Sequence, residues 1–223
     1  MTDKGGDDLP SADEILDASE RAMGSEEARA SLDSVSAIAA CRGPKFEYET
    51  RLISDRSGDL VFQQFLPGRK NIAGILDGKG WGLNDQGHIE AINSVEKFLL
   101  RAHEFQLLAL DLGKRYHEFK TVESCVIDGQ ITHHLSMVDE LGHPASAFVS
   151  VHSHLPLRLI LTNPRADGPP VMTTRFDGWR LMSGLYVVSH VTLLSGPEEW
   201  VFDFTTLELN VAHATAFQLP MTR

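Results

Sequence analysis

The residues of this sequence most suited to chemistry are its histidines, of which there are 10. Three imidazoles on one face of a sheet can hold a zinc ion and leave a position open for water, as in a metal hydrolase. His134 would lie near His152 and His154 if strands over 131–138 and 148–161 formed a hairpin across Gly142. The alternation of the second strand, however, puts His152 and His154 on its polar side, and a catalytic metal needs a sheltered site. We therefore predict a solvent-facing polar stripe, with no metal and no cofactor.

His133 stands apart from the other histidines because of its neighbours. It shares parity with Ile131, Leu135 and Met137, which are expected to face inward in a strand. A buried polar group normally has a hydrogen-bond partner. His133 is thus either a core histidine with one such partner or a polar group inside a ligand cavity.

Motifs for other kinds of catalysis are missing from the sequence. Ser183 and Ser195 each precede a glycine but lack the G-x-S-x-G context of a nucleophile elbow. The glycine-rich stretch 77–82 has neither the P-loop nor the dinucleotide-binding spacing. No close acidic pair has the arrangement of an acid/base couple. The acidic residues that we expect in turns or on the surface are Asp111, Glu123 and Asp128.

The element that must position the histidines is a predicted long strand over residues 148–162. Its apolar set from Val149 to Leu161 alternates strictly with a mostly polar set from Phe148 to Thr162. Successive side chains of a strand point to opposite faces, so the strand has one apolar face. A sheet of this kind needs a cover over that face, either a closed core or a lid over a cavity.

Helical signals occur at the N-terminus and in the middle of the chain. Ser11 and Glu14 form a capping box that begins a helix ending near Gly24, and Ser25 caps a second short helix. Residues 94–112 follow a helical period and are predicted to form one long helix. Its apolar stripe consists of Val95, Phe98, Leu99, Ala102, Phe105 and Leu108 or Ala109.

The rest of the chain from about Val35 onward reads as short strands separated by turns, about ten or eleven in all. Asp77-Gly78 between two of them is a strong hairpin signal. Strands at this spacing are typical of a sheet that curls or closes. The fold class is therefore mainly β with an α cover (α+β). We predict a disordered tail over residues 1–10 and one domain over residues 11–223.

Charge and composition exclude several classes of function. The formal net charge of -11 excludes a general nucleic-acid-binding role, which needs clustered lysines and arginines. No apolar run is long enough for a membrane span, and the acidic start lacks a secretory h-region. As read, the chain is expected to be cytoplasmic, or periplasmic if a leader was removed. Cys41 and Cys125 could be bonded or free.

Several motifs together resemble the outer-membrane lipoprotein-sorting (lipoprotein carrier, LolA-like) family. They are the opening PSADEIL helix, the hairpin Leu76-Asp77-Gly78-Lys79 with Trp81, and the run His154-Leu155-Pro156-Leu157-Arg158. The resemblance extends from about Ser11 to Val211. It implies a strongly curved antiparallel sheet forming an incomplete barrel, which the N-terminal and central helices plug. It also implies a hydrophobic cavity for acyl chains and a carrier without catalytic activity.

We accordingly expect the protein to bind and carry a lipid-like or lipoprotein acyl ligand in an apolar cavity under a helical lid, with transient membrane or membrane-protein contact. One alternative is a cofactor-free cyclase or isomerase acting on a hydrophobic metabolite in the same cavity. Others are the histidine-ligated metal hydrolase and a module that adds a strand to a partner through an open sheet edge. The residues expected to contact the ligand, with His133 as polar anchor, are Phe98, Leu99, Phe105, His133, Leu135, Met137, Val151, Leu155, Leu157, Phe202 and Phe204.

Overall fold

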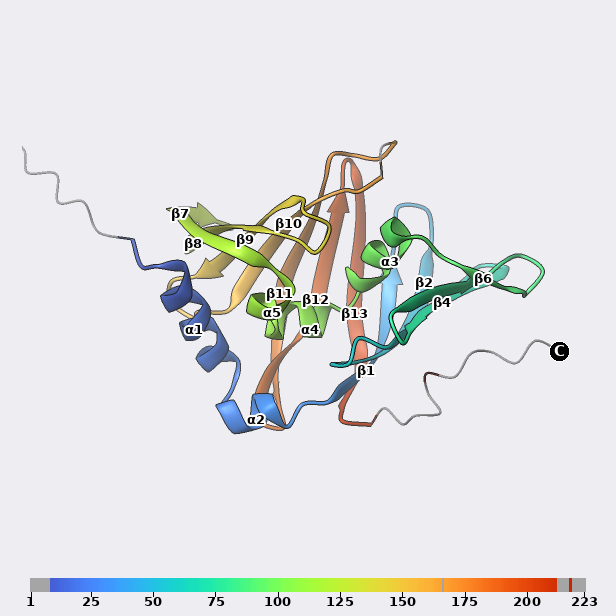
Figure 1. Cartoon of the computed structure of the whole chain (residues 1–223), viewed down its shortest axis with the longest axis horizontal. Helices are drawn as coiled ribbons and strands as arrows, with labels where there is room; N and C mark the ends of the chain where they lie inside the picture. The colour runs from blue at the N-terminus through green and yellow to red at the C-terminus, as the bar shows by residue number, and fades with distance from the viewer. Residues whose placement is uncertain (1–8, 166, 212–216, 218–223) are drawn as a thin grey trace, which may run out of the picture.

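One antiparallel sheet of 13 strands forms the frame of the protein (Figure 1). The computed structural model describes residues 9–165, 167–211 and 217. The strands follow the order β6-β5-β4-β3-β2-β1-β13-β12-β11-β10-β9-β8-β7, so β6 and β7 are its two edges and the sheet stays open. Their bounds are β1 Ser34–Arg42, β2 Glu47–Asp55, β3 Leu60–Leu66, β4 Arg69–Leu76, β5 Lys79–Leu83, β6 Ile89–Ala91, β7 His117–Ile127, β8 Gln130–Val138, β9 Pro144–Ser150, β10 Pro156–Thr162, β11 Val171–Met182, β12 Leu185–Ser195 and β13 Glu198–Leu209.

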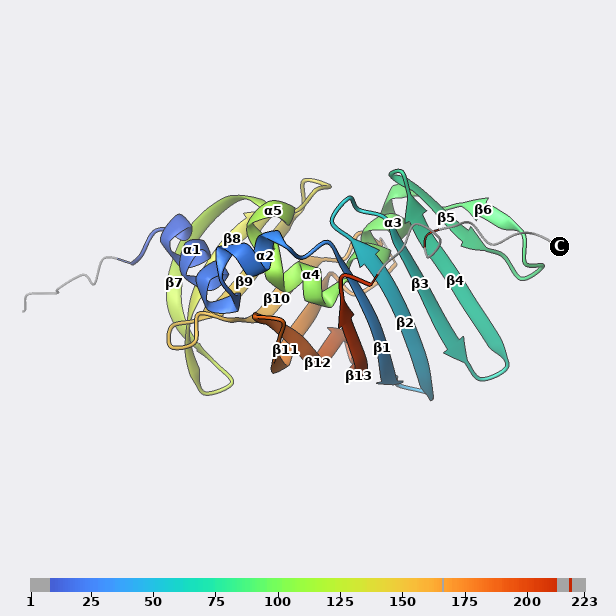
Figure 2. The same ribbon diagram turned by 90° about the horizontal axis from the view of Figure 1, so that it is seen from below.

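Helical segments lie in the hollow of this curved sheet, as Figure 2 shows. The predicted mainly β fold, an incomplete barrel with a helical cover, is confirmed. Two segments come from the N-terminus and three from the middle of the chain. They are α1 Ala12–Met23, α2 Glu26–Ala30, α3 Ser94–Arg101, α4 Phe105–Leu110 and α5 Leu112–Arg115.

Local signals set the first helix and the hairpins. The Ser11 hydroxyl accepts a hydrogen bond from the Glu14 amide at 3.3 Å, and the Glu14 carboxylate accepts one from the Ser11 amide at 2.7 Å. This is the predicted capping box, and it begins α1. Asp77 (φ 49°) and Gly78 (φ 71°) both adopt the left-handed region in the β4–β5 turn, as a type I′ hairpin requires. Both predictions are confirmed.

The predicted long strand over 148–162 is wrong, because the chain reverses in its middle. Residues 151–155 form a tight turn, and β9 and β10 on either side of it pair antiparallel. The Ser150 hydroxyl accepts the amides of His152 and Ser153 at 3.3 and 3.2 Å, and His154 adopts φ 56°. The alternation survives on both sides of the turn because Val149 and Leu159 return to the same covered face, each 0% exposed.

The predicted single helix over 94–112 is also wrong, since three short helices replace it. Residues 102–104 form a turn in which the amides of His103 and Glu104 bond to carbonyls three residues back. The break lets the segment follow a curved surface, because α3 packs on β4 and β5 whereas α4 packs on β12. A straight helix of that length would extend nearly 30 Å and could not contact both regions.

The main core lies between the helices and the covered face of β8–β13. Phe105 of α4 packs on Phe202 with ring centroids 5.0 Å apart, and on Phe204 at 6.2 Å. From the other end of the sheet, Leu135 and Leu161 reach the same cluster. The predicted tail lies largely outside the described residues, which begin at Leu9.

The edges of the sheet are poorly suited to adding a partner strand. β6 has only 3 residues. The pairing of β7 with β8 shifts register twice, between His117 and Lys120 and between Thr121 and Glu123, and Glu118 has φ 57°. Bulges and irregular backbone of this kind protect an edge against further pairing. The strand-adding alternative therefore gains no support from the two edges.

Candidate ligand-binding cleft

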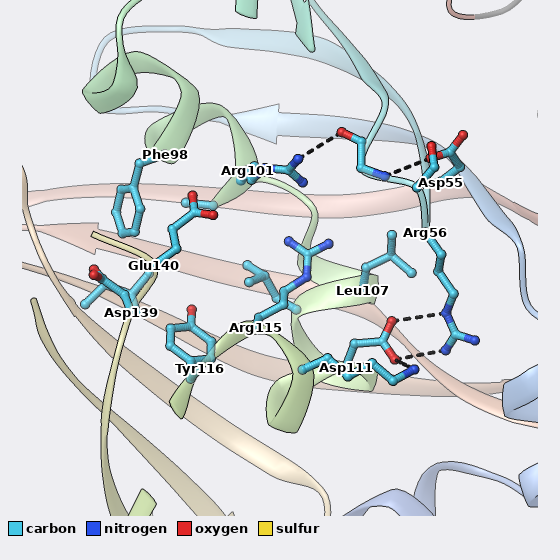
Figure 3. Close-up of a pocket in the computed structure, with 16 residues that line it drawn as sticks. Asp55, Arg56, Phe98, Arg101, Leu107, Asp111, Arg115, Tyr116, Asp139 and Glu140 are labelled. Carbon is cyan, nitrogen blue, oxygen red and sulfur yellow. Dashed lines mark hydrogen bonds and ion pairs between the residues drawn. The ribbon is translucent and has the colours of Figure 1, made fainter. Parts of the chain in front are cut away.

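A cleft of about 410 Å³ lies where the helical cover meets the sheet (Figure 3). Three parts of the chain form its walls: the β2–β3 turn, the helical segment 98–116 and the β8–β9 turn. Its volume is within the range of sites that bind small molecules, roughly 300–1,000 Å³. The lining residues are Asp55, Arg56, Ser57, Gly58, Phe98, Arg101, Ala102, Leu107, Leu108, Asp111, Lys114, Arg115, Tyr116, Asp139, Glu140 and Leu161.

The cleft has an apolar floor that is continuous with the main core. Phe98, Leu108, Tyr116 and Leu161 line the cleft and also belong to the core cluster, at 2–7% exposure. They come from α3, α4, the end of α5 and β10, so the cover and the sheet both contribute. An apolar group in the cleft would therefore contact the protein core directly.

One side of the cleft is a charged network centred on Asp111. Arg56 donates from Nε to Asp111 Oδ2 at 3.2 Å and from Nη2 to Oδ1 at 2.9 Å. Lys114 Nζ reaches Asp111 Oδ1 at 3.1 Å. Arg56 also donates to the Arg29 carbonyl in α2. These bonds fasten the β2–β3 turn to both the central and the N-terminal helices.

A second network lies beneath the cleft and is centred on Glu104, whose side chain is 0% exposed. Glu104 Oε2 accepts hydrogen bonds from Arg115 at 2.7 Å and from Arg101 at 3.3 Å. Arg101 also donates to the Gly58 carbonyl at 2.9 Å. A buried carboxylate is stable only when it is paired in this way. Glu104 thus holds the turn between α3 and α4 against α5.

The third wall carries polar groups that can still form hydrogen bonds. Asp139 is 1% exposed, and its Oδ1 accepts the amides of Leu141 and His143, both at 2.9 Å. Its Oδ2 is buried and makes no hydrogen bond within the described residues. The hydroxyl of Tyr116 points into the cleft close to Asp139 and Glu140 (Figure 3). Burial raises the pKa of Tyr116 well above its ordinary value, so this hydroxyl stays protonated.

Of the eleven residues expected to contact a ligand, Phe98 lines the cleft and the other ten lie elsewhere among the described residues. Five of those ten are packed against one another in the main core at 6% exposure or less, with Leu99 beside them. These side chains fill the centre of the half-barrel, so they can meet a ligand only if α4 moves. The five are Phe105, Leu135, Met137, Phe202 and Phe204.

The remaining four expected contacts lie toward the turn between β9 and β10. Val151 and Leu155 are partly buried in that turn and not in a strand, and Leu157 follows in β10. His133 lies in β8 with its Nδ1 3.2 Å from the Ser124 hydroxyl, but this contact is exposed and His133 is only partly buried, so it is not a core histidine. Burial lowers the pKa of His133, and nearby His154 lowers it further.

The histidine triad proposed as a zinc site does not form. His134 stacks on Phe148 with ring centroids 4.6 Å apart, whereas His152 and His154 lie in the β9–β10 turn. In the described part of the chain, no group of three or more histidine, cysteine, aspartate or glutamate side chains is arranged to hold a metal ion. This alternative depended on the wrong strand assignment, since both histidines lie in the turn and not in a strand beside β8.

The charged residues around the cleft were not predicted as functional. Asp111 was expected to be a turn or surface residue, yet it is 8% exposed and paired with Arg56, which is 55 positions away. The same holds for Arg101, Arg115 and Tyr116, which were not predicted as functional residues. A possible signal was the concentration of arginines and acids within the otherwise apolar segment 98–116.

Comparison of the structure with solved structures identifies the fold. A LolA superfamily protein from Nitrosomonas europaea matches with a TM-score of 0.65 at 13% identity, over 95% of this chain and 99% of that one. The chain has a LolA-like fold. A DUF1329 family protein from Desulfovibrio piger matches the LolA-like chain with a TM-score of 0.59 at 14% identity, over 92% of this chain and 98% of that one.

A third match is a putative outer membrane lipoprotein-sorting protein domain from Vibrio parahaemolyticus, with a TM-score of 0.56 at 10% identity. It covers 92% of the LolA-like chain and 94% of the other. No protein-family model matches the sequence, and no curated protein does so either. The predicted resemblance is therefore confirmed at the level of the fold. Among the described residues, no helix is both long and apolar enough to cross a membrane.

Proposed function

We propose that this protein binds and carries an acyl-chain or similar lipid-like ligand, which enters at the cleft between the helical cover and the curved sheet. The observation that carries the proposal is the cleft itself, with its floor of Phe98, Leu108 and Leu161 continuous with the core. A structure from Vibrio parahaemolyticus with the same fold is described as a putative outer membrane lipoprotein-sorting domain, which supports the ligand class.

Burial of an acyl chain supplies free energy that can offset the cost of moving the helical cover. Each methylene moved from water into an apolar site contributes about 0.8 kcal/mol, so a chain of about ten methylenes contributes about 8 kcal/mol before entropy losses. Breaking one partly buried ion pair such as Arg56–Asp111 costs about 2 kcal/mol. Displacing α4 also removes the apolar contacts of Phe105, Leu107 and Leu108, which are 1–4% exposed, so the ligand chain would replace these contacts as it extends over the core face that α4 now covers.

A substitution that fills the cleft tests the proposal. Ala102 lines the cleft at the end of α3 and is partly exposed, so Ala102→Trp would occupy the space without removing a core contact. We expect the variant to lose at least about tenfold in affinity for the neutral apolar dye N-phenyl-1-naphthylamine, a loss equivalent to about 1.4 kcal/mol.

Ala91→Trp is the matched control, because Ala91 is exposed on β6 and away from the cleft residues. It should bind the dye as the parent protein does. Circular dichroism melting curves would show that both variants keep the fold. Unchanged dye affinity in a folded Ala102→Trp variant would contradict the cleft as the entry site.

A further inference from the structure

We infer that the cleft binds the polar head of an amphiphile, and that this head is a hydrogen-bond donor, an ammonium or a hydroxyl group, and not an anion. The inference rests on the proposed function, since it specifies the ligand of the same cleft. Eight of the sixteen lining residues are charged, so the cleft suits a polar group better than the middle of an acyl chain.

The cations of the cleft are already engaged by carboxylates of the protein. Arg101 and Arg115 both donate to Glu104, and Arg56 and Lys114 both donate to Asp111. An anionic head would compete with these buried carboxylates, which cannot move away without losing their own partners. The three arginines therefore serve the protein's own ion pairs, and Lys114, at 65% exposure, is the cation of the cleft that solvent reaches most.

The hydrogen-bond acceptors of the cleft, by contrast, can accept further hydrogen bonds. Asp139 is 1% exposed, and its Oδ2 makes no hydrogen bond within the described residues. His143 Nδ1 lies 3.6 Å from this oxygen, within ion-pair distance but beyond hydrogen-bond distance. A buried carboxylate oxygen without a donor is costly, and a donor supplied by a ligand would remove that cost. Glu140, exposed beside Asp139, adds a second negative charge to this wall.

Tyr116 supplies the second half of the proposed head-group site. The residue is 7% exposed, and its hydroxyl has no hydrogen-bond partner in the described structure although it points into the cleft (Figure 3). Burial is the main cause of the rise in the pKa of this hydroxyl; Arg115 lowers the pKa, and Asp139 and Glu140 raise it further. Asp139 and Glu140 line the same cleft as Tyr116. A neutral phenol hydroxyl can accept a hydrogen bond from an ammonium or hydroxyl group as well as donate one.

The apolar residues of the cleft determine the direction that the acyl chain of the ligand would take from the head group. Phe98 and Leu161 line the cleft together with Asp139 and Glu140. Both residues belong to the main core cluster. The first methylenes after the head would therefore rest on Phe98 and Leu161 and lead toward the core that α4 covers.

A set of ligands with the same dodecyl chain and different heads tests the inference on the full chain. Dodecylamine, dodecanol, dodecanoate and dodecyltrimethylammonium would each be titrated against bound N-phenyl-1-naphthylamine. We expect the amine and the alcohol to compete at least about tenfold better than dodecanoate, from one hydrogen bond to a charged group. The trimethylammonium head is positive but donates no hydrogen bond, so it should compete as weakly as dodecanoate.

The outcomes separate this inference from the proposed function. Equal or tighter binding of dodecanoate would overturn the donor head while leaving ligand binding in place. Strong competition by dodecyltrimethylammonium would show that charge alone selects the head, which also overturns the inference. A dye that does not bind the parent protein at all would refute the proposed function itself.

Variants assign the selection to specific atoms. Asp139→Asn keeps an oxygen for the amides of Leu141 and His143 but replaces Oδ2 with an amide group that donates, so it should fold and lose the preference for the amine. Tyr116→Phe keeps the ring and removes only the hydroxyl. Glu199→Gln, at an exposed position of β13, is the control for loss of one negative charge. An undiminished preference in a folded Asp139→Asn variant would overturn the assignment.

Discussion

Arg56 and Asp111 form a bidentate ion pair, at 3.2 and 2.9 Å, that joins the β2–β3 turn to the junction of α4 and α5. The two side chains are 22% and 10% exposed, so water screens the pair only in part. This directional pair adds to the apolar packing of α4, in which Phe105, Leu107 and Leu108 are only 1–4% exposed. A single substitution can remove the pair while leaving the apolar packing in place.

Replacing Arg56 should loosen the cover. Arg56→Ala leaves Asp111 with Lys114 as its remaining cation, and we expect the free energy of unfolding to fall by about 2 kcal/mol. Amide hydrogen exchange should rise across residues 105–115. Arg51→Ala is the matched control, because Arg51 pairs with Glu49 at 53% and 42% exposure and such surface pairs contribute less than about 1 kcal/mol. Equal losses in the two variants would contradict a fastening role for Arg56.

Glu104 should contribute more to stability than any exposed acid. Glu104→Gln removes the charge that Arg101 and Arg115 share, which leaves two guanidinium groups at 25% and 20% exposure without their counter-ion. Urea unfolding should show a loss of about 2–4 kcal/mol. The comparison variant Glu198→Gln, at an exposed position, should remain within about 0.5 kcal/mol of the parent.

His103 should make the stability depend on pH. Its ring lies 4.7 Å from that of Phe62 and 5.8 Å from that of Phe105, and its Nδ1 is 2.8 Å from the Leu99 carbonyl. Burial lowers its pKa below the ordinary 6.5. In the window below about pH 6.5 the unfolded chain thus binds a proton that the folded one does not, so stability is lost as the pH falls through that window.

The variant His103→Phe keeps an aromatic ring between these partners and removes the titration. Its unfolding free energy should fall less steeply than that of the parent when the pH decreases below about 6.5. His88→Phe, in the exposed turn before β6, is the comparison. An identical pH slope in His103→Phe and in the parent protein would rule out this origin of the pH dependence.

The two cysteines should react at different rates. Both are free; Cys41 is buried at 1% exposure and Cys125 is partly buried. Burial raises the pKa of Cys41 to about 11, and the reactive species is the thiolate. A thiol reagent such as DTNB should therefore modify Cys125 first, and Cys41 only on unfolding. Cys125→Ser should remove the fast phase; a fast phase that persists in this variant would contradict the prediction.

Features governed by neighbouring residues could be predicted from the sequence. The capping box of Ser11 and Glu14 and the Asp77-Gly78 turn depend on contacts within four residues, and the structure has both. The mainly β class and the helical cover also followed from periodicity. Alternation was less reliable at 148–162, because a short turn preserves the parity of the strands on either side. The hydroxyl of Ser150 and the left-handed His154 form that turn, and neither changes the pattern.

The sequence by itself determined which residues are apolar, where α1, α2 and α3 begin and that one face of the sheet would need a cover, because these properties depend on local order along the chain. Only the tertiary structure decided where the cover breaks, which side chains close the half-barrel and where a hollow remains. The cleft joins Arg56, Tyr116 and Asp139, which are far apart in the chain. Their meeting follows from the curvature of the sheet and the bend at residues 102–104, and no spacing in the sequence encodes either.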